Sequence, residues 1–407
     1  MKWKTVPFSE LYAIPSKNGL TKPQRVRGNG YKMVNMGELF NNERIYDIPM
    51  ERVPLLKNEK KAKLEPLDLL FARQSLVASG AGQCSIVMET DALTVYESHL
   101  IRVRLNKEKA NPLFYFYYFR SPLSPMPTIV QQCAQAGIRA ETLGRLEVLC
   151  PDIDTQNKIV EILEPYNRLI ENHRRQIALL EEAAQRIYTE WFVDLHFPGA
   201  ESSKITNGLP DGWRRLPFFP TIEIMSGGTP STSKPDYYRG NIPFFTPKDC
   251  GDHFFAFDTE KHISEDGLKH CNSKLYPKNT IVITARGTVG KVILLGVPMA
   301  MNQSCFAFRS DEIASPYFLY FLLRHASDEL RIKANGGVFD TITIRSFNDM
   351  SVLVPDPKRM NQFLKIITPM MEQMQVFSKE TTYLQEARDR LLPRLMAGGD
   401  GASSLPR

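Results

Sequence analysis

The longest regular pattern of apolar positions in the chain lies between residues 155 and 191. The positions alternate in steps of four and three, at Ile159, Leu163, Tyr166, Ile170, His173, Ile177, Leu180, Ala184, Ile187 and Trp191. This spacing is typical of a helix that packs against another helix in a coiled coil. We therefore expect a helix that starts at Asp154 or Thr155 as N-cap, is kinked or broken at Pro165, and runs to about Asp194.

The same seam occurs a second time, 204 residues further along the chain. Its positions are Phe363, Ile367, Met370, Met374, Phe377, Thr381, Leu384, Arg388, Leu391 and Leu395. The helix breaker is repeated, because Pro165 corresponds to Pro369, and the Pro-Asp pair at 151–152 corresponds to that at 355–356. A repeat of this length predicts two homologous halves, each a globular region followed by a long helix.

The two globular regions share several local patterns. Trp3 and Trp213 open them, and strand-like runs lie before Arg73 and Arg286, which we align with each other as we do Gly137 and Gly337. The aromatic run at 113–119 lacks a polar face, which favours a buried helix over a surface that stacks on bases.

These patterns predict an α+β fold, in which two tandem α/β domains alternate with two long helices. We expect a first domain at 1–150, a helix at 151–199, a linker at 200–212, a second domain at 213–354, a second helix at 355–397 and a tail at 398–407.

Composition narrows the class of protein. A chain of 407 residues suits two domains better than one core. It has no apolar run long enough to span a membrane and no signal-peptide pattern, so we expect a soluble cytoplasmic protein. The six cysteines include no Cys-x-x-Cys pair, which argues against a disulfide framework or a thiolate zinc site.

The net charge of +6 is unevenly distributed. Residues 1–150 carry 21 basic and 14 acidic side chains, residues 151–200 carry 5 and 9, and residues 201–355 carry 17 and 16. A basic first domain and an acidic first helix fit a polyanion on the domain and a protein partner on the helix. A solvated acidic helix face is the alternative for the second observation.

No set of residues forms a convincing catalytic site. The loop at 287–291 has too few residues between its glycines for a phosphate-binding loop, and the run that starts at Asn241 lacks the first proline of an amino-methyltransferase motif. Asp47 with the run at 59–61 matches a nuclease pattern only in its letters. His173 lies on the seam, where a polar residue more often sets helix register than binds metal. We therefore expect a binding subunit.

The order of motifs across both halves resembles the specificity subunits of type I restriction-modification systems. The motifs are Glu190-Trp191-Phe192-Val193, Phe197-Pro198-Gly199, Ser226-Gly227-Gly228-Thr229-Pro230, Ile242-Pro243-Phe244, residues 278–291, Met301-Asn302-Gln303 and residues 390–395. The resemblance implies two target recognition domains that read a bipartite double-stranded DNA site. It also implies an antiparallel coiled coil with pseudo-two-fold symmetry that separates the domains.

The resemblance implies partners and cofactors as well. Two modification (methyltransferase) subunits would bring S-adenosylmethionine, and restriction subunits would use ATP and Mg²⁺, while this chain would be non-catalytic and bind no cofactor or metal. Candidate residues follow from loop position and residue type. For DNA binding they are Arg25, Arg27, Lys60, Lys61, Ser231, Lys234, Tyr237, Lys248, Arg286 and Lys291. For helix packing they are Leu163, Ile170, Ile177, Leu180, Met374, Phe377, Leu384 and Leu391, and for subunit docking Arg174, Arg175, Glu181 and Glu182.

Two other classes of protein stay open at this point. An independent DNA methyltransferase or nuclease would bind S-adenosylmethionine or cut DNA without partners. A scaffold that joins proteins through its coiled coil would show no sequence preference on DNA, and the nearly neutral second domain favours it.

Overall fold

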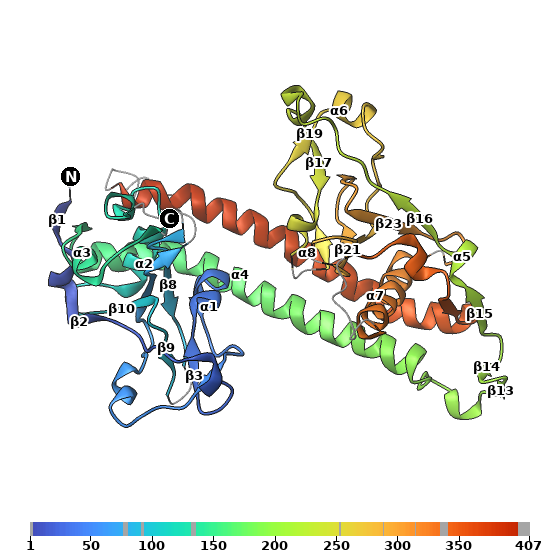
Figure 1. The fold of residues 1–407 in the computed structure, drawn as a ribbon, viewed down its shortest axis with the longest axis horizontal. Helices are drawn as coiled ribbons and strands as arrows, with labels where there is room; N and C mark the ends of the chain where they lie inside the picture. The colour runs from blue at the N-terminus through green and yellow to red at the C-terminus, as the bar shows by residue number, and fades with distance from the viewer. Residues whose placement is uncertain are drawn as a thin grey trace. The chain divides into compact units, whose positions relative to one another are not determined.

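The computed structural model describes residues 3–75, 80–90, 93–131, 136–251, 254–287, 289–313, 315–333 and 341–397 (Figure 1). The chain forms two compact units: the first contains Met1–Leu169 with Leu384–Arg407, and the second contains Ile170–Tyr383. The boundaries of these units therefore run through both long helices. Gly337, Thr288 and the expected tail at 398–407 lie outside the described residues.

The first unit is built on a five-stranded sheet. Its strands, in spatial order, are β2 (Tyr12–Asn18), β10 (Leu100–Leu105), β6 (Leu69–Ala72), β8 (Cys84–Val87) and β4 (Arg44–Ile45). The pairing is antiparallel except between β4 and β8. Helix α2 (Pro112–Arg120) packs against β8. Asn111 caps α2 by accepting a hydrogen bond from the Leu113 amide at 3.0 Å, and Phe119 contacts Phe71 with ring centroids 5.0 Å apart. The aromatic run thus forms the buried helix that its pattern predicted.

Smaller elements complete the first unit. They are the pair β1 (Lys4–Pro7) and β12 (Glu147–Cys150), the three-stranded sheet of β5 (Arg52–Val53), β3 (Tyr31–Val34) and β9 (Val95–Tyr96), and the pair β7 (Gln74–Ser75) and β11 (Ala136–Gly137). The short helices are η1 (Phe8–Leu11), η2 (Gln24–Val26), α1 (Met36–Asn41), η3 (Glu59–Ala62), η5 (Met126–Thr128) and α3 (Ala140–Gly144).

The second unit repeats this topology. Its five-stranded sheet has the order β16 (Glu223–Ser226), β23 (Cys305–Arg309), β20 (Ile281–Thr284), β21 (Val292–Leu295) and β18 (Phe255–Ala256), again with one parallel pair, β18 with β21. Helix α7 (Pro316–Lys333) packs on β20 and β21, as α2 packs on β8. The matching order and directions confirm the two homologous α/β domains.

The remaining sheets of the second unit also have counterparts, apart from one hairpin, which is preceded by a short helix that has none either. They are β15 (Arg214–Pro217) with β24 (Ser351–Val354), β19 (His262–Ile263) with β17 (Ile242–Phe245) and β22 (Ala300–Met301), and the hairpin β13 (Ile205–Thr206) and β14 (Leu209–Pro210). The short helices are η7 (Ala200–Ser202), α5 (Phe218–Thr221), η8 (Pro235–Tyr238), η9 (Pro247–Asp249), α6 (Glu265–Lys269) and η10 (Ile344–Phe347).

The hydrogen bonds correct one expected alignment between the halves. The Arg73 amide donates to the His99 carbonyl at 2.8 Å, and the equivalent bond in the second unit runs from Ala285 to Ser304 at 2.7 Å. Arg73 is therefore the counterpart of Ala285, and its alignment with Arg286 was wrong by one residue. Sequence pattern alone could not fix the register, because both strands end in small loops of different length.

A glycine at the same place in each unit allows two chain segments to cross closely. A Cβ atom on Gly19 would lie 2.0 Å from the Tyr96 carbonyl oxygen, and one on Gly227 would lie 2.1 Å from that of Asn302. No real Cβ atom tolerates such a distance, so both positions require glycine. The two glycines hold the loop after the first strand of each large sheet against the small three-stranded sheet.

The long helices are α4 (Ile153–Tyr188), which is extended by the π-helical turn η6 (Thr189–Val193), and α8 (Pro357–Met396). The Asp152 carboxylate accepts hydrogen bonds from the amide and hydroxyl of Thr155 at 2.9 and 2.8 Å. Asp152 thus caps α4 two or three residues before the expected position. Helix α4 also continues through Pro165, so the expected break is absent. Pro165 lies on the exposed side of the helix, away from the core.

The two helices pack antiparallel. In the first unit, Ile159 and Leu163 near the start of α4 share a core with Leu392 and Leu395 near the end of α8. The core of the second unit unites late α4 residues with early α8 residues, namely Ile177, Ala184, Tyr188, Phe363, Ile367, Met371 and Met374. Met371 is fully buried, whereas the seam had placed its neighbour Met370 there. No helix in the described ranges is both long enough and apolar enough to cross a membrane.

Candidate nucleic-acid interface

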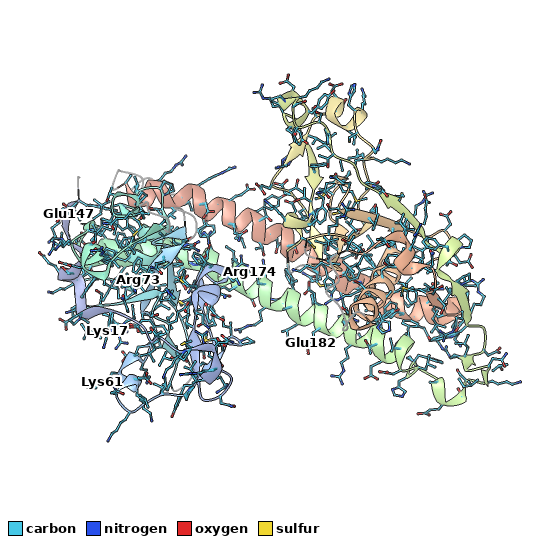
Figure 2. The ribbon with its side chains drawn as sticks, viewed as in Figure 1. Lys17, Lys61, Arg73, Glu147, Arg174 and Glu182 are labelled. Atoms are coloured by element: carbon cyan, nitrogen blue, oxygen red, sulfur yellow. The ribbon has the colours of Figure 1, made fainter. Side chains whose placement is uncertain are left out.

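A group of exposed basic side chains lies around the small three-stranded sheet of the first unit. We call this group the basic face, and its members are Arg25, Lys57, Lys60, Lys61 and Lys63. The ion pair between Lys22 and Glu59, at 2.6 Å, joins the segment before η2 to η3, which brings Arg25 to the same region as the lysines. Lys60 also lies over the ring of Tyr31, 5.6 Å from its centroid. In Figure 2 the labelled Lys61 lies at the edge of the first unit.

The acidic side chains near the basic face are neutralised by other residues. Glu51 pairs with Arg27 at 2.6 Å, Glu65 pairs with Arg104 at 2.7 Å, and Glu59 is held by Lys22. The side-chain hydrogen bond from Lys22 and the amide of Leu56 lower the pKa of Glu59, so its charge is kept in this pair. No ion pair is seen for the five basic-face side chains among the described residues. Their positive charge is therefore available to a polyanion.

Arg27 differs from the other expected DNA-binding residues of the first unit. Its guanidinium donates to the Lys22 carbonyl at 3.0 Å and to Glu51 at 2.6 Å. These contacts tie the loop after η2 to the small sheet. The structure therefore gives Arg27 an internal partner, while Arg25 stays exposed.

The expected residues of the second unit also separate into exposed and internal groups. Ser231, Lys248 and Arg286 are exposed. Tyr237 is buried, and its hydroxyl accepts a hydrogen bond from Lys234 at 3.0 Å. This hydrogen bond raises the pKa of Lys234.

An open groove of about 580 Å³ lies beside the Ser231 loop. Its lining residues are Thr232, Tyr238, Arg239, Gly240, Asn241, Glu260, Lys261 and His262. Much of the charge near it is paired, because Arg239 contacts Asp236 at 3.2 Å and His262 contacts Asp258 at 2.9 Å. The groove therefore offers amide, hydroxyl and aromatic groups more than net charge. Lys291, the last expected residue, is half-buried beside the C-terminal end of β20, where its amide donates to the Thr284 hydroxyl at 3.1 Å.

The expected packing residues are buried or half-buried on the two long helices. Leu163, Ile170, Ile177 and Met374 are buried, and Leu180, Phe377, Leu384 and Leu391 are half-buried. His173 stacks on Phe377 with ring centroids 4.8 Å apart. These two residues are counterparts in the repeat, as expected where two antiparallel copies of one helix cross.

The expected docking residues are mostly exposed on α4. Arg174, Arg175 and Glu182 face solvent, and Figure 2 labels Arg174 and Glu182 along the helix. Glu181 is different, because its carboxylate accepts a hydrogen bond from the Phe254 amide at 3.1 Å and so helps to hold the domain on the helix. A groove of about 520 Å³ begins beside it, lined by Ala178, Glu181, Glu182, Gln185, Arg186, Thr189, Glu190 and Arg324.

Sequence reasoning missed two exposed apolar residues on the long helices. Leu179 on α4 is 59% exposed, and Tyr383 on α8 is 67% exposed. They are counterparts in the repeat. One turn before them, Arg175 and Lys379 are also exposed counterparts. One turn after them, so are Glu182 and residue 386. Applying the repeat to polar and exposed positions, not only to the seam, would have found this pattern.

The described residues contain no group of three or more side chains arranged to hold a metal ion. Burial raises the pKa of the Cys84 and Cys305 thiols, which opposes formation of a nucleophilic thiolate. Asp47 and Glu59, the acids of the nuclease-like pattern, pair separately with Lys32 and Lys22. The two acids of that pattern are therefore held in separate ion pairs.

The fold defines a class of two-domain, coiled-coil proteins, and known proteins share it. The solved structure of a type I restriction-modification S subunit from M. genitalium superposes with a TM-score of 0.58, at 14% identity, over 97% of this chain and 96% of that one. The HindI specificity subunit of Haemophilus influenzae is 22% identical over 90% of this chain and 93% of its own length. The MjaIX specificity subunit of Methanocaldococcus jannaschii is 23% identical over 93% and 88%.

The model of the type I restriction modification DNA specificity domain matches residues 1–182 and 221–381. The chain belongs to this family and carries two target recognition domains. It is a specificity subunit, a non-catalytic member of a type I restriction-modification system.

Proposed function

We propose that the two units bind the two halves of a bipartite double-stranded DNA site. The observation that carries this proposal is the basic face, whose five exposed side chains have no described ionic partner while the nearby acids do. Lysine and arginine that contact phosphates fix a protein on DNA and release counterions. The first unit would thus supply most of the electrostatic attraction.

The second unit would depend more on polar contacts to base edges. Ser231, Lys248 and Arg286 are exposed near loops, and the neighbouring groove is lined by Asn241, Tyr238 and other polar side chains. Arginine and asparagine side chains discriminate bases in the major groove by about 1–3 kcal/mol per good bidentate contact. Two homologous units with different loops would read two unlike half-sites.

The partners would be two modification subunits, docked on the long helices, together with restriction subunits. The recurrence of a basic, an apolar and an acidic exposed residue at Arg175, Leu179 and Glu182 and again at their counterparts supports two copies of one partner. S-adenosylmethionine, ATP and Mg²⁺ would be bound by those partners and not by this chain.

The DNA proposal is tested with the chain co-expressed with its methyltransferase subunit. Mapping of methylated adenines by single-molecule sequencing should give a split motif with two unlike halves. The complex with Lys60→Ala and Lys61→Ala should bind all sequences more weakly, and its log–log salt dependence should lose about one unit of slope per lysine. Lys107→Ala, which removes an exposed lysine outside the basic face, is the control. An unchanged slope in the double variant would exclude the basic face, and the absence of any sequence preference would favour a scaffold.

The docking proposal is tested by native mass spectrometry of the same complex. Leu179→Ala should lose one methyltransferase subunit, and Leu179→Ala with Tyr383→Ala should lose both. Leu169→Ala is a matched control, because Leu169 is 46% exposed on the same helix but its counterpart is Gln373. Full stoichiometry in the double variant would refute this docking surface.

A further inference from the structure

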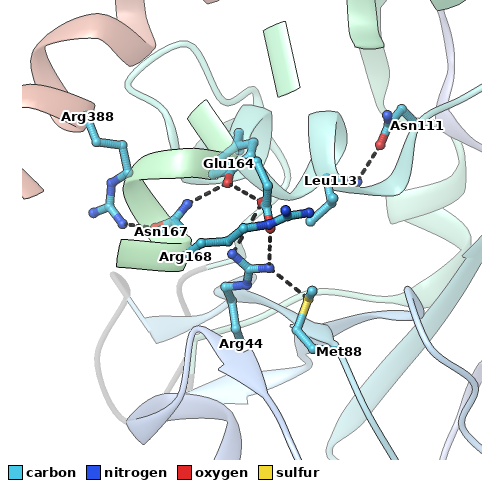
Figure 3. A network of polar contacts seen from close by, with 9 residues as sticks. Arg44, Met88, Asn111, Leu113, Glu164, Asn167, Arg168 and Arg388 are labelled. Carbon is cyan, nitrogen blue, oxygen red and sulfur yellow. Dashed lines mark hydrogen bonds and ion pairs between the residues drawn. The ribbon is translucent and has the colours of Figure 1, made fainter. Parts of the chain in front are cut away.

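A buried polar cluster connects the two long helices in the first unit (Figure 3). Glu164 of α4 is held by Arg44, whose Nη2 lies 2.8 Å from Oε1, and by the Tyr117 hydroxyl, 3.0 Å from Oε2. The amide of Asn167 donates to the same hydroxyl, and Arg388 of α8 donates from Nη1 to Asn167 Oδ1 at 2.7 Å. We call these five residues the Glu164 cluster.

The members of the Glu164 cluster need one another because water is excluded from most of them. Glu164 and Asn167 are 7% and 4% exposed, and the Arg388 side chain is 13% exposed. Arg388 is the cluster member contributed by α8, and it donates to the amide oxygen of Asn167. A buried amide oxygen without a donor is unfavourable, so α4 requires a hydrogen-bond donor here, and Arg388 of α8 supplies it.

The counterpart positions in the second unit are almost entirely apolar. The repeat and the strand pairing place Phe255, Phe321, Thr368, Met371 and Ala184 where the first unit has Arg44, Tyr117, Glu164, Asn167 and Arg388. Met371, Phe321 and Ala184 are fully buried. One helix contact of the molecule is therefore polar and charged, while the homologous contact is a hydrophobic core.

This difference matters because α4 and α8 carry the same four-and-three seam, and such a seam also permits pairing of two identical helices. In a pair of two α4 helices from two chains, Ala184 would stand in the place of Arg388 and leave the Asn167 oxygen without its donor. In a pair of two α8 helices, Arg388 would enter the site of Ala184 and face Met371 and Phe321, which offer no acceptor. Both pairs of identical helices thus bury an unsatisfied polar group.

We propose that the Glu164 cluster makes each half of the chain select the other half as its helix partner and reject a second copy of itself. The α4 surface then pairs with α8 and not with a second α4, and the hydrogen bond between Arg388 and Asn167 determines this preference. A single buried polar residue can specify the partner and register of a coiled coil in the same way. The inference concerns assembly of the chain itself and does not depend on the DNA-binding proposal.

The test reproduces each disfavoured contact inside the intact chain. Arg388→Ala creates the contact of an α4 pair, and Ala184→Arg creates that of an α8 pair. Each should lower the Tm of the purified full chain by at least about 5 °C. Arg390→Ala, which removes an exposed arginine from the same helix, is the control and should have little effect.

A second substitution at the contacting position shows whether the loss of stability comes from a mismatch between the two helices or from a general loss of packing. Asn167→Met should restore most of the stability lost in Arg388→Ala, because it removes the buried amide oxygen to which Arg388 donates. Met371→Asn should likewise raise the Tm of Ala184→Arg above that of either single variant. Additive losses in both double variants, or single variants that melt like Arg390→Ala, would overturn the proposal. If Ala184→Arg does not fold, the Arg388 and Asn167 variants still decide the question.

Discussion

Replacing Glu164 by alanine should destabilise the first unit more than any surface change of charge. Glu164 forms a bidentate ion pair with Arg44, with Oε–Nη distances of 2.8 and 3.3 Å, and the two side chains are 10% and 5% exposed. Without the carboxylate, the buried Arg44 guanidinium loses this ion pair, and the Tyr117 hydroxyl loses its acceptor.

The expected magnitude follows from this burial. Breaking one partner of a buried pair costs about 3–5 kcal/mol, whereas an exposed pair contributes less than about 1 kcal/mol. For units of this size each kcal/mol lowers Tm by about 2–4 °C, so Glu164→Ala should lower it by about 6–20 °C. Arg168→Ala removes an exposed partner of the same carboxylate, 3.4 Å away and 77% exposed, and should change Tm by less than about 4 °C.

Urea and thermal unfolding of the full chain, followed by circular dichroism, measure both effects. A third variant, Arg44→Met with Glu164→Met, identifies the cause, because an apolar pair of similar volume should recover most of the loss. A Glu164→Ala chain as stable as Arg168→Ala would refute the reasoning. So would a double variant as unstable as Glu164→Ala, since the cost would then come from lost packing and not from an uncompensated charge.

Three further predictions concern the glycine crossings and the helix caps. Gly19→Ala and Gly227→Ala should each lower the free energy of unfolding by about 1–3 kcal/mol, because a backbone oxygen occupies the place of the new Cβ. Gly37→Ala is the control, because no atom lies within 4 Å of its new Cβ. Equal denaturation midpoints for all three variants would contradict this prediction. Asp356→Ala should cost about 1 kcal/mol in urea unfolding, because its carboxylate accepts from the start of α8 and from the Trp213 indole, and no change would remove its role as a cap. The amide and hydroxyl of Thr155 lower the pKa of Asp152, so the stabilisation by this carboxylate is present above its ordinary pKa and is lost in acid. The Tm difference between wild type and Asp152→Ala should therefore shrink between about pH 7 and about pH 3. A constant Tm difference would refute this prediction.

The sequence predicted those parts of the fold that depend on periodicity. The two seams, the repeat and the buried aromatic helix follow from spacing alone, since a helix face must be continuous to pack. The position of the α4 cap was missed, because Asp152 and Asp154 are equally good capping residues and only the backbone shows which one is used. Similarly, the buried residue after Ile367 is Met371 and not Met370, so the seam takes a step of four residues there in place of the expected three.

The candidate DNA-binding residues were harder to predict. Loop position and residue type cannot show that Arg27 is held by Glu51 or that Tyr237 is buried under Lys234, because those partners are distant in sequence or depend on how a turn folds. The Glu164 cluster was invisible for the same reason: its members come from four separate segments. The recurrence of exposed residues such as Leu179 after 204 residues was present in the sequence, but it lies outside the apolar seam positions from which the repeat was recognised.

The division of both long helices between the two units has a consequence for how the chain is made. The core of the first unit contains Leu392 and Leu395, which leave the ribosome more than 200 residues after Leu169. At synthesis rates of about 5–20 residues per second, the newly made first domain waits roughly 10–40 seconds for the last part of its core. During that interval Ile159 and Leu163 lack the apolar surface that later covers them. The order of synthesis thus makes the last turns of α8 the part that completes the core of the first unit.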